Sequence, residues 1–276
     1  MTDFLELQRV AEQVAQQAAA AIATKRAELG NVAEYTQTKS SAVDPVTIVD
    51  TFAEELIVAK LAELRPGDGV VGEEGSENAS ITGVTWIIDP IDGTVNFLYG
   101  IPQFAVSLGA AQDGKVVAGA VINVSTDELY SAASGHGARL SAGGEIRSLR
   151  CTEVQQVSQS LLATGFGYSA ARRERQAALV AKLLPQVRDI RRMGSAALDL
   201  CAVASGQVDA HLEHGLNAWD YAAGSLIAEE AGAVVHIPPL SSVGESGELT
   251  FVAAPGIFDE LWQCLEGAGG AQSIGS

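Results

Sequence analysis

Hydrophobic residues recur every three or four positions near the N-terminus, at Leu7, Ala11, Val14, Ala18 and Ile22. This spacing predicts a helix with a polar outer face that ends near Gly30. A second helix is predicted to reach Leu64 from an N-cap at Thr47. Asp50 stands three residues after Thr47, as in a capping box, and Pro66-Gly67 would stop the helix.

The middle of the chain changes to short apolar runs that predict strands at 84–88, 104–110, 116–124 and 129–132. Gln112-Asp113-Gly114-Lys115 is typical of a hairpin turn. From Leu161 onward, strands alternate with helices predicted at 170–184, 195–205 and 221–231, and a strand and a last helix follow. We therefore expect an α/β protein built from layers of helix and sheet, with one extended and largely antiparallel sheet.

The chain has 276 residues and no Pro/Ser-rich linker, which favours one compact domain over residues 1–266. Residues 267–276 are rich in glycine and polar residues, so a flexible tail is expected there. We expect no membrane segment and no signal peptide, because no apolar run is long enough and the N-terminus lacks a basic region. Cys151, Cys201 and Cys264 are odd in number and widely spaced, which indicates reduced thiols in the cytoplasm.

A strand-like run ends in two acids within residues 86–94, Trp-Ile-Ile-Asp-Pro-Ile-Asp-Gly-Thr. Pro90 has a fixed backbone angle and no amide hydrogen, so we expect the strand to end and the chain to turn there. The turn would bring Asp89 and Asp92 together and would free the carbonyl of Ile91 as another oxygen ligand. Taken alone, this segment is also typical of a solvated turn.

The residues that follow fit a binding site for an anion bridged to a cation. Gly93 lets the backbone pass close to a ligand. A helix beginning near Thr94 would direct its first amide groups toward the two acids. A phosphate group held by a metal ion would satisfy both sets of charges.

Further segments repeat this chemistry: Gly72-Glu73-Glu74, Gly194-Ser195-Ala196-Ala197, and Trp219-Asp220 with the small residues that follow. With Lys39-Ser40-Ser41 and the segment 44–50, in this order, they resemble the inositol monophosphatase family and its bacterial SuhB-like branch. The resemblance covers nearly the whole chain. It implies a five-layer αβαβα sandwich, a homodimer and inhibition by lithium.

Four carboxylates (Glu73, Asp89, Asp92 and Asp220) and the Ile91 carbonyl form an all-oxygen ligand set, which favours Mg²⁺ over zinc. The four histidines show no paired ligand spacing. The resemblance implies two to three ions: one held by Glu73, Asp89 and Ile91, one by Asp89, Asp92 and Asp220, and a weaker one near Glu73. Two such metals suit hydrolysis of a phosphate monoester.

The formal charge of −17 argues against a nucleic-acid surface, and it also conflicts with an anionic substrate. Bound cations would resolve this conflict, because they convert clustered carboxylates into an anion site.

The resemblance also implies catalytic roles for Asp50, Glu73 and Thr94. The Thr94 hydroxyl, hydrogen-bonded to Asp50, would accept a proton from metal-bound water with help from Glu73. Two alternatives stay open: Asp50 could be only a helix-capping acid, and Asp220 could be only the N-cap of its helix. Lys39 could be a surface lysine or lie near the third metal.

Substrate contacts are implied for Asp92, Gly93, Thr94, Gly194, Ser195, Ala196, Glu213 and Asp220. In the family, a glutamate seven residues before the Trp-Asp aspartate binds polyol hydroxyls, and Glu213 is the matching residue. Gly194, Ser195 and Ala196 would supply amides and a hydroxyl at a helix N-terminus, or they could simply begin a capped helix.

The leading hypothesis is a Mg²⁺-dependent phosphatase for inositol 1-phosphate. The same site could instead act on histidinol phosphate, fructose 1,6-bisphosphate or a 3′-phosphoadenylate. A third hypothesis adds a role in binding transcription machinery, as in some bacterial members. It would depend on the one basic concentration, at residues 172–192, which could equally be a solvated helix face and dimer contact.

Overall fold

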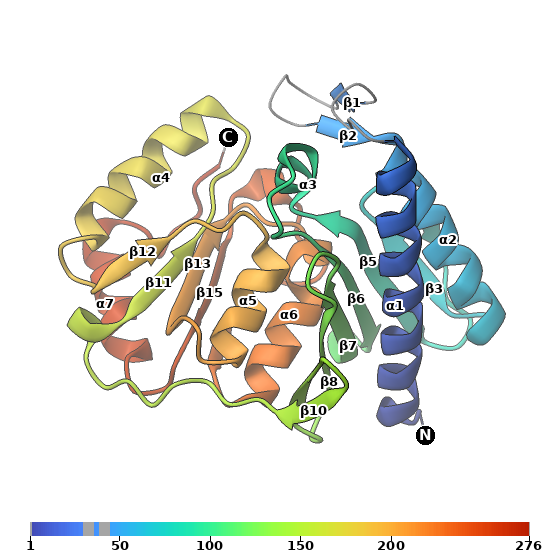
Figure 1. Ribbon diagram of the computed structural model, residues 1–276. Coiled ribbons are helices and arrows are strands. Elements are labelled where there is room, and N and C mark those ends of the chain that lie inside the picture. Colours follow the sequence, from blue (N-terminus) through green and yellow to red (C-terminus); the bar gives the residue numbers. More distant parts are fainter. Residues whose placement is uncertain (1, 30–35, 39–44, 276) are drawn as a thin grey trace.

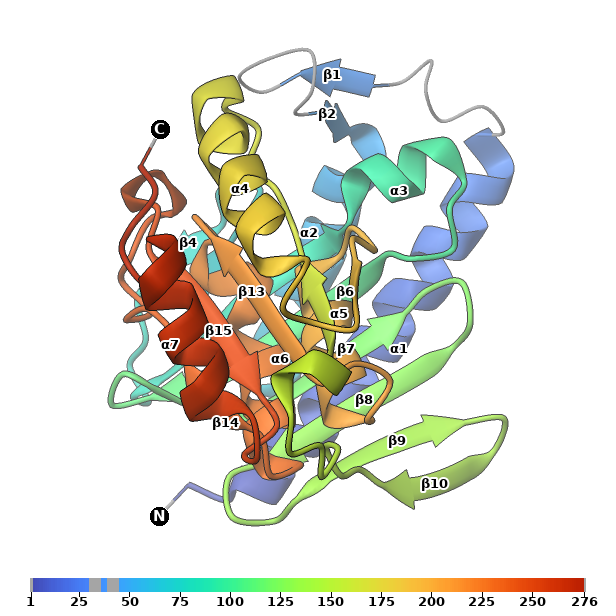
Figure 2. The same ribbon diagram turned by 90° about the vertical axis from the view of Figure 1, so that its left-hand side faces the viewer.

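The computed structural model describes residues 2–29, 36–38 and 45–275. Helices and two main sheets alternate in five layers (Figure 1). α1 (Phe4–Leu29) and α2 (Ile48–Leu64) cover the outer face of the first sheet, and α5 (Ala196–Ala204) and α6 (Ala218–Glu230) lie between the sheets. α4 (Ala170–Leu183) and α7 (Phe258–Ala268) cover the outer face of the second sheet, which faces the viewer in Figure 2. The predicted αβαβα sandwich is confirmed.

The first sheet has the strand order β10-β9-β8-β7-β6-β5-β3-β4. Among its described strands only β3 and β5 pair in parallel, so the predicted, largely antiparallel sheet is confirmed. Asp113 and Gly114 have φ angles of 52° and 74° in the hairpin between β6 and β7, as the Asp-Gly pair predicts. The strands of the first sheet are β3 (Gly69–Gly72), β4 (Glu77–Asn78), β5 (Val84–Asp92), β6 (Ala105–Gln112), β7 (Lys115–Asn123), β8 (Glu128–Ala133), β9 (Ala138–Ala142) and β10 (Glu145–Ser148).

The second sheet has the order β12-β11-β13-β15-β14. β11 pairs in parallel with both β12 and β13, whereas β15 is antiparallel to its two neighbours. A separate pair is formed by β1 (Thr36–Thr38) and β2 (Pro45–Thr47). The strands of the second sheet are β11 (Leu161–Thr164), β12 (Asp189–Arg191), β13 (Ala210–His214), β14 (Val234–His236) and β15 (Leu249–Ala253).

β5 corrects the expectation of a turn at Pro90, because the strand continues to Asp92. Asp89 lies opposite Ser107, and Asp92 lies opposite Ala105, so β5 has one more residue than β6 between these pairs. This is a bulge, which tolerates the missing amide hydrogen of proline. The chain turns later, at Gly93 (φ 92°), where α3 (Thr94–Tyr99) begins as predicted.

The middle helices pack closely on the first sheet through small residues. A Cβ atom added to Gly109 of β6 or to Gly119 of β7 would lie 3.1 Å from the Cβ of Ala222 or Ala223 on α6. Two glycines therefore let α6 approach the sheet, and the N-terminus of α6 lies near the end of β5. The Thr47 side chain and Lys39 fall outside the described residues.

The C-terminal segment differs from the flexible tail expected for residues 267–276. Ile274 is buried in the core of the second sheet, and its amide donates to the Gly247 carbonyl at 2.8 Å. The Gly270 carbonyl lies 2.8 Å from Nε2 of His214. Ile274 buries apolar surface that the glycine-rich composition of this segment does not reveal. Among the described residues, no helix has the length and apolar character needed to cross a bilayer.

Candidate active site

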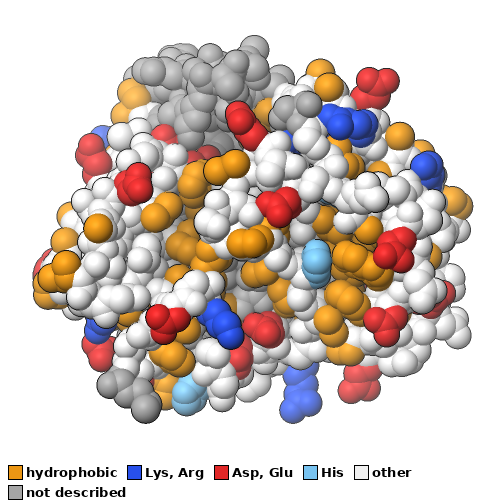
Figure 3. All heavy atoms as spheres, turned by 180° about the vertical axis from the view of Figure 1, so that it is seen from behind, with side chains coloured by type: hydrophobic (Ala, Val, Ile, Leu, Met, Phe, Trp, Pro, Cys, Tyr) orange, Lys and Arg blue, Asp and Glu red, His pale blue; other side chains and the backbone are white. Residues whose placement is uncertain are grey.

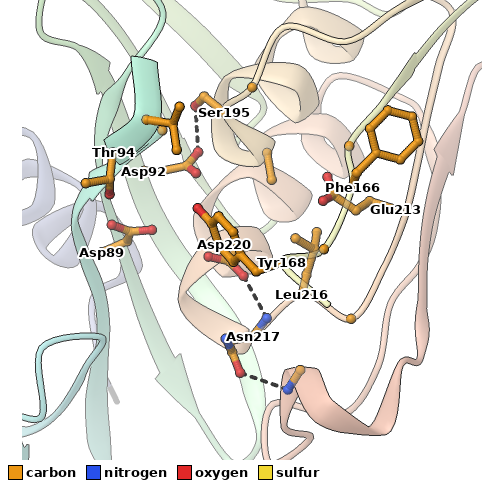
Figure 4. A pocket seen from close by; sticks show the side chains of 18 of the residues that line it. Asp89, Asp92, Thr94, Phe166, Tyr168, Ser195, Glu213, Leu216, Asn217 and Asp220 are labelled. Carbon is orange, nitrogen blue, oxygen red and sulfur yellow. Dashed lines mark hydrogen bonds between the residues drawn. The ribbon is translucent and has the colours of Figure 1, made fainter. Parts of the chain in front are cut away.

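A cavity of about 560 Å³ lies where the end of β5 meets the N-termini of α3, α5 and α6 and the end of β13. Figure 4 shows Asp89, Asp92 and Thr94 on one side of it and Glu213 and Phe166 on the other. The cavity contains most residues proposed from the sequence: Glu73, Asp89, Ile91, Asp92, Gly93, Thr94, Gly194, Ser195, Ala196, Glu213 and Asp220. The two halves of the protein therefore contribute opposite walls.

Three acids form a compact cluster on one wall. Carboxylate oxygens of Asp89, Asp92 and Asp220 lie within 4.8 Å of one another. Asp220 lies in the first turn of α6, and its Oδ2 accepts the Asn217 amide at 2.7 Å in a capping box. Asn217 is therefore the N-cap of α6, so the alternative in which Asp220 is only the N-cap of this helix is wrong. One carboxylate both supports the helix start and reaches the cluster.

The cluster is electrostatically unfavourable without a cation. Burial, followed by repulsion from Glu73, Asp92 and Asp220, raises the pKa of Asp89 well above its usual value. Burial and repulsion from Glu73 and Asp92 do the same to the pKa of Asp220. A bound divalent cation would remove this repulsion, and the all-oxygen donor set fits a hard cation such as Mg²⁺.

Asp92 is less perturbed because it has hydrogen-bond donors. Its Oδ2 accepts the Ser195 hydroxyl at 2.6 Å and the Ala197 amide at 2.7 Å. Burial raises the pKa of Asp92 to about 6, and these two hydrogen bonds oppose the rise. The start of α5 therefore stabilises the charged form of Asp92.

Glu73 reaches the cavity from the turn after β3. Its amide donates to the Ile88 carbonyl at 3.2 Å, which continues the parallel pairing of β3 with β5. The pairing places Glu73 next to Asp89, the residue after Ile88. Two acids far apart in sequence thus become neighbours through the ladder.

The relay through Thr94 and Asp50 stays a prediction, because the hydrogen bond observed for the Thr94 hydroxyl has another partner. The Thr94 hydroxyl donates to the Ile91 carbonyl at 3.0 Å, and the Ile91 amide donates to Asp89 at 3.0 Å. Asp50 is buried, 3% exposed, on α2 and is not among the residues that line the cavity. The relay through Asp50 would require the Thr94 hydroxyl to change its partner.

Ser195 is both the N-cap of α5 and a residue of the cavity. Its hydroxyl oxygen accepts the Leu198 amide at 3.3 Å while the hydroxyl donates to Asp92. Gly93 lies close by, and a Cβ there would be 2.9 Å from the Gln103 carbonyl oxygen and 3.1 Å from that of Gly194. The capped helix start and the cavity wall are therefore the same structure.

Glu213 lies on the opposite wall, near the end of β13. The described part of the chain provides no hydrogen-bond partner for its carboxylate, although the residue is only 9% exposed. Burial raises the pKa of Glu213 to about 8; the charge of Arg192 opposes the rise and that of Asp92 adds to it. Gly165 lies against this carboxylate, and the Glu213 carboxylate occupies the space that a side chain at position 165 would need.

Sequence reasoning missed several cavity residues: Asp199 of α5, the loop 165–169, Arg172 and Arg192. Asp199 is 1% exposed, four residues after Ser195 in an otherwise apolar helix, and this isolated acid was the available signal. Its Oδ2 lies 3.7 Å from Nδ1 of His211. Burial lowers the pKa of His211 to about 3, so this histidine is neutral.

The basic residues between 172 and 192 differ in exposure: Arg172 is buried and Arg173 is half-buried, whereas the others are exposed, namely Arg175, Lys182, Arg188, Arg191 and Arg192. Arg172 is buried and donates to the Glu245 carbonyl at 3.0 Å, and Lys182 donates to the Ala268 carbonyl at 2.9 Å. Arg191 pairs with Asp189 at 2.6 Å. On the face shown in Figure 3, Lys and Arg side chains are scattered among acidic and hydrophobic ones.

Nearly the whole chain resembles known proteins. A sequence model described as "Inositol monophosphatase family" matches residues 3–260. The chain belongs to this family. It is 50% identical to the inositol-1-monophosphatase SuhB of Mycobacterium tuberculosis strain H37Rv, over 97% of this chain and 96% of that protein.

A solved structure of Mycobacterium tuberculosis SuhB matches with a TM-score of 0.86 and 47% identity, covering 99% of this chain and 100% of that one. A protein named Nus factor SuhB, from Pasteurella multocida, is 39% identical over 72% of this chain and 73% of its own length. The resemblance seen in the motifs is confirmed, and the protein is a phosphatase. Enzymes of the family generally depend on metal ions, and the acidic cluster of this phosphatase could hold one.

Proposed function

We propose that this phosphatase hydrolyses inositol 1-phosphate to inositol and phosphate with Mg²⁺ as cofactor. One observation carries the proposal: the acids of one cavity wall converge within 4.8 Å, while Glu213 on the opposite wall has no hydrogen-bond partner among the described residues. The first group suits cations that bind a phosphate, and the second suits hydroxyl groups. A polyol phosphate has both parts in one small molecule.

The proposed ligands divide between two ions that share Asp89. Glu73, Asp89 and the Ile91 carbonyl would hold one, Asp89, Asp92 and Asp220 the other, and Glu73 would hold a weaker third through waters. When bound, Mg²⁺ supplies an acidified water and neutralises the leaving oxygen. The chain's own contribution is to fix these oxygens in place, through the capping box of α6 and the hydrogen bonds from α5 to Asp92.

The proton of the attacking water would be accepted by the Thr94 hydroxyl and Glu73, with Asp50 behind Thr94. In the structure the Thr94 hydroxyl is hydrogen-bonded to the Ile91 carbonyl. With a cation on the Ile91 carbonyl oxygen, that oxygen would be a poorer acceptor, and the Thr94 hydroxyl would be free to take Asp50 as its partner instead. This sequence of partners reconciles the observed bond with the proposed base.

Substrate contacts are proposed for both walls. Gly93, Thr94 and the start of α5 (Gly194, Ser195 and Ala196) would surround the phosphate, where the unpaired amides at a helix N-terminus favour anions. Asp92 and Asp220 would contact the ester through the metal. Glu213 would accept hydrogen bonds from the ring hydroxyls of inositol, the substrate class for which the mycobacterial relative with 50% identity is named.

A panel of phosphate esters tests the substrate. We expect the highest kcat/KM for inositol 1-phosphate, lower values for histidinol phosphate, fructose 1,6-bisphosphate and 3′-phosphoadenylate, and no turnover after metal removal until Mg²⁺ is restored. Another ester with a tenfold higher kcat/KM would replace inositol 1-phosphate in the proposal. Activity that persists in a chelator would contradict the proposed metal.

A second function has one observation in its favour, the 39% identity to a relative named as a Nus factor. We propose it only as an additional interaction with transcription machinery, through the basic segment 172–192. Capture of purified RNA polymerase by the tagged protein tests it. Binding unchanged by substitution of the exposed Arg191 would remove this segment from the proposal.

Three further properties are proposed from the family: a homodimer, a cytoplasmic location and inhibition by lithium. Li⁺ is close to Mg²⁺ in size but has half its charge, so it could occupy a cation site without supporting the leaving oxygen. Light scattering measures the mass, and a Li⁺ titration at fixed Mg²⁺ measures inhibition. A monomeric mass would contradict the first of these proposals, and full activity at high millimolar Li⁺ would contradict the third.

A further inference from the structure

A second buried carboxylate lies on α2, one helical turn after Asp50. Glu54 is 2% exposed, although it belongs to a helix on the outside of the first sheet. Its carboxylate does not face the cavity. It lies instead beneath the turn that connects β3 to β4, and Glu73 is part of this turn.

Both oxygens of Glu54 hold the backbone of this turn. Oε2 accepts the Glu74 amide at 2.8 Å, and Oε1 accepts the Ser76 amide at 2.9 Å. The turn is closed on itself by the Gly72 amide, which donates to the Ser76 carbonyl at 2.8 Å. A charged acceptor with two amide donors fixes the turn more firmly than neutral hydrogen bonds would.

Gly72 is the residue that allows this arrangement. A Cβ atom at position 72 would lie 2.5 Å from Oε2 of Glu54 and 2.7 Å from its Cδ. Any side chain there would therefore push the carboxylate out from under the turn. Glu54 and Gly72 together set where the backbone of Glu73 sits relative to Asp89.

We propose that Glu54 is a positioning residue for metal binding, which holds the turn so that the Glu73 carboxylate points at the acidic cluster. This inference rests on the proposed role of Glu73 as a metal ligand. It gives α2 two tasks, one at Asp50 and one at Glu54. Groups behind a metal ligand commonly change metal affinity by roughly 10–100-fold when they are altered.

The test is Mg²⁺ binding to the full-length, metal-stripped protein, measured by titration calorimetry, together with the Mg²⁺ dependence of kcat. Glu54→Gln keeps the size of the side chain but turns an NH₂ group toward one of the two amides. We expect about 10–100-fold weaker Mg²⁺ binding, with kcat at saturating Mg²⁺ reduced much less. Glu55→Gln is the matched control, because Glu55 is the exposed neighbour on the same helix and loses the same charge.

Gly72→Ala approaches the same contact from the other side and should weaken Mg²⁺ binding in the same way. It also decides the question if Glu54→Gln does not fold. Wild-type Mg²⁺ affinity in the folded variants would overturn the proposal, and so would a loss of thermal stability or kcat at unchanged affinity, since that is a purely structural role. An unmodified chain that binds no Mg²⁺ would instead refute the proposed function.

Discussion

The two walls of the cavity differ in how their acidic side chains are arranged: they are clustered on one wall, and a single one stands on the other. The wall from the first sheet crowds Glu73, Asp89 and Asp92 together, and α6 adds Asp220. The wall from the second sheet carries Glu213 beside Gly165, without a hydrogen-bond partner among the described residues. Crowded acids select cations, whereas one isolated carboxylate selects hydrogen-bond donors. On the proposed function, the first wall performs the reaction and the second wall selects the substrate.

The largest effect is expected on the first wall. Asp92→Asn should reduce kcat by roughly a thousand-fold, on the order of 4 kcal/mol in the barrier, because one proposed cation loses a charged ligand. The fold should survive, since an asparagine oxygen can still accept the Ser195 hydroxyl and the Ala197 amide. Initial rates at saturating Mg²⁺ and the melting temperature measure both. Near-normal turnover by the folded variant would refute the metal site.

A smaller and selective effect is expected on the second wall. At a pH above about 8, where the carboxylate is charged, Glu213→Ala should lower kcat/KM for inositol 1-phosphate by about 10–100-fold, because hydrogen bonds to a charged group are worth about 1.5–3 kcal/mol. An aryl phosphate has no ring hydroxyls and should be affected much less. Parallel kinetics on the two esters make the measurement. An equal loss on both would mean that Glu213 supports the site as a whole, and the contrast between the walls would disappear.

Ser195 connects the walls, so Ser195→Ala should show how far they are independent. The variant loses one hydrogen bond to Asp92 and the cap of α5, at a cost of about 1 kcal/mol for the cap. The pKa of Asp92, already raised to about 6, should rise further. At subsaturating Mg²⁺, where protons compete with the metal for Asp92, activity should therefore fall several-fold near pH 6 and recover near pH 8. A loss that does not depend on pH would show that the hydroxyl contacts the substrate only.

The smallest effect concerns stability without metal. Because burial raises the pKa of Glu213 to about 8, and the pKa values of Asp89 and Asp220 are also raised, the folded protein holds protons that the unfolded chain releases. This contribution is present at low pH and is lost as pH rises through these values. His211, with a pKa lowered to about 3, acts oppositely, but only below its ordinary value of 6.5.

The melting temperature of the metal-free protein should therefore fall by a few degrees between pH 6.5 and 8.5, at about 2–4 °C per kcal/mol. Saturating Mg²⁺ should cancel most of the decline, because it binds the folded state. Glu213→Gln should flatten the slope in part, whereas His136→Gln, on an exposed turn, should not. A flat profile for the unmodified protein would show that the acids are less strained than their burial suggests.

The sequence predicted the first wall better than the second. The acids of the first wall lie in contiguous motifs, so chemistry and spacing could be read together. Helix periods and the Asp113-Gly114 turn are local signals and were confirmed in the same way. Asp199, the loop 165–169 and Glu54 meet the site only through packing between elements far apart in the chain. No local pattern identifies such contacts, and composition likewise did not reveal that Ile274 is buried.

The bulge in β5 determines on which face of the strand Asp89 and Asp92 lie. In a regular strand, side chains alternate between the two faces, so residues three apart, such as Asp89 and Asp92, would point in opposite directions. The extra residue between them resets the alternation and lets both acids face the cavity. Straightening the strand without shortening it, so that three regular steps separate the two acids, would turn one of them away from the cavity. A shift in the alternation of side chains along β5, with no change of residue type, would be enough to separate the two acids.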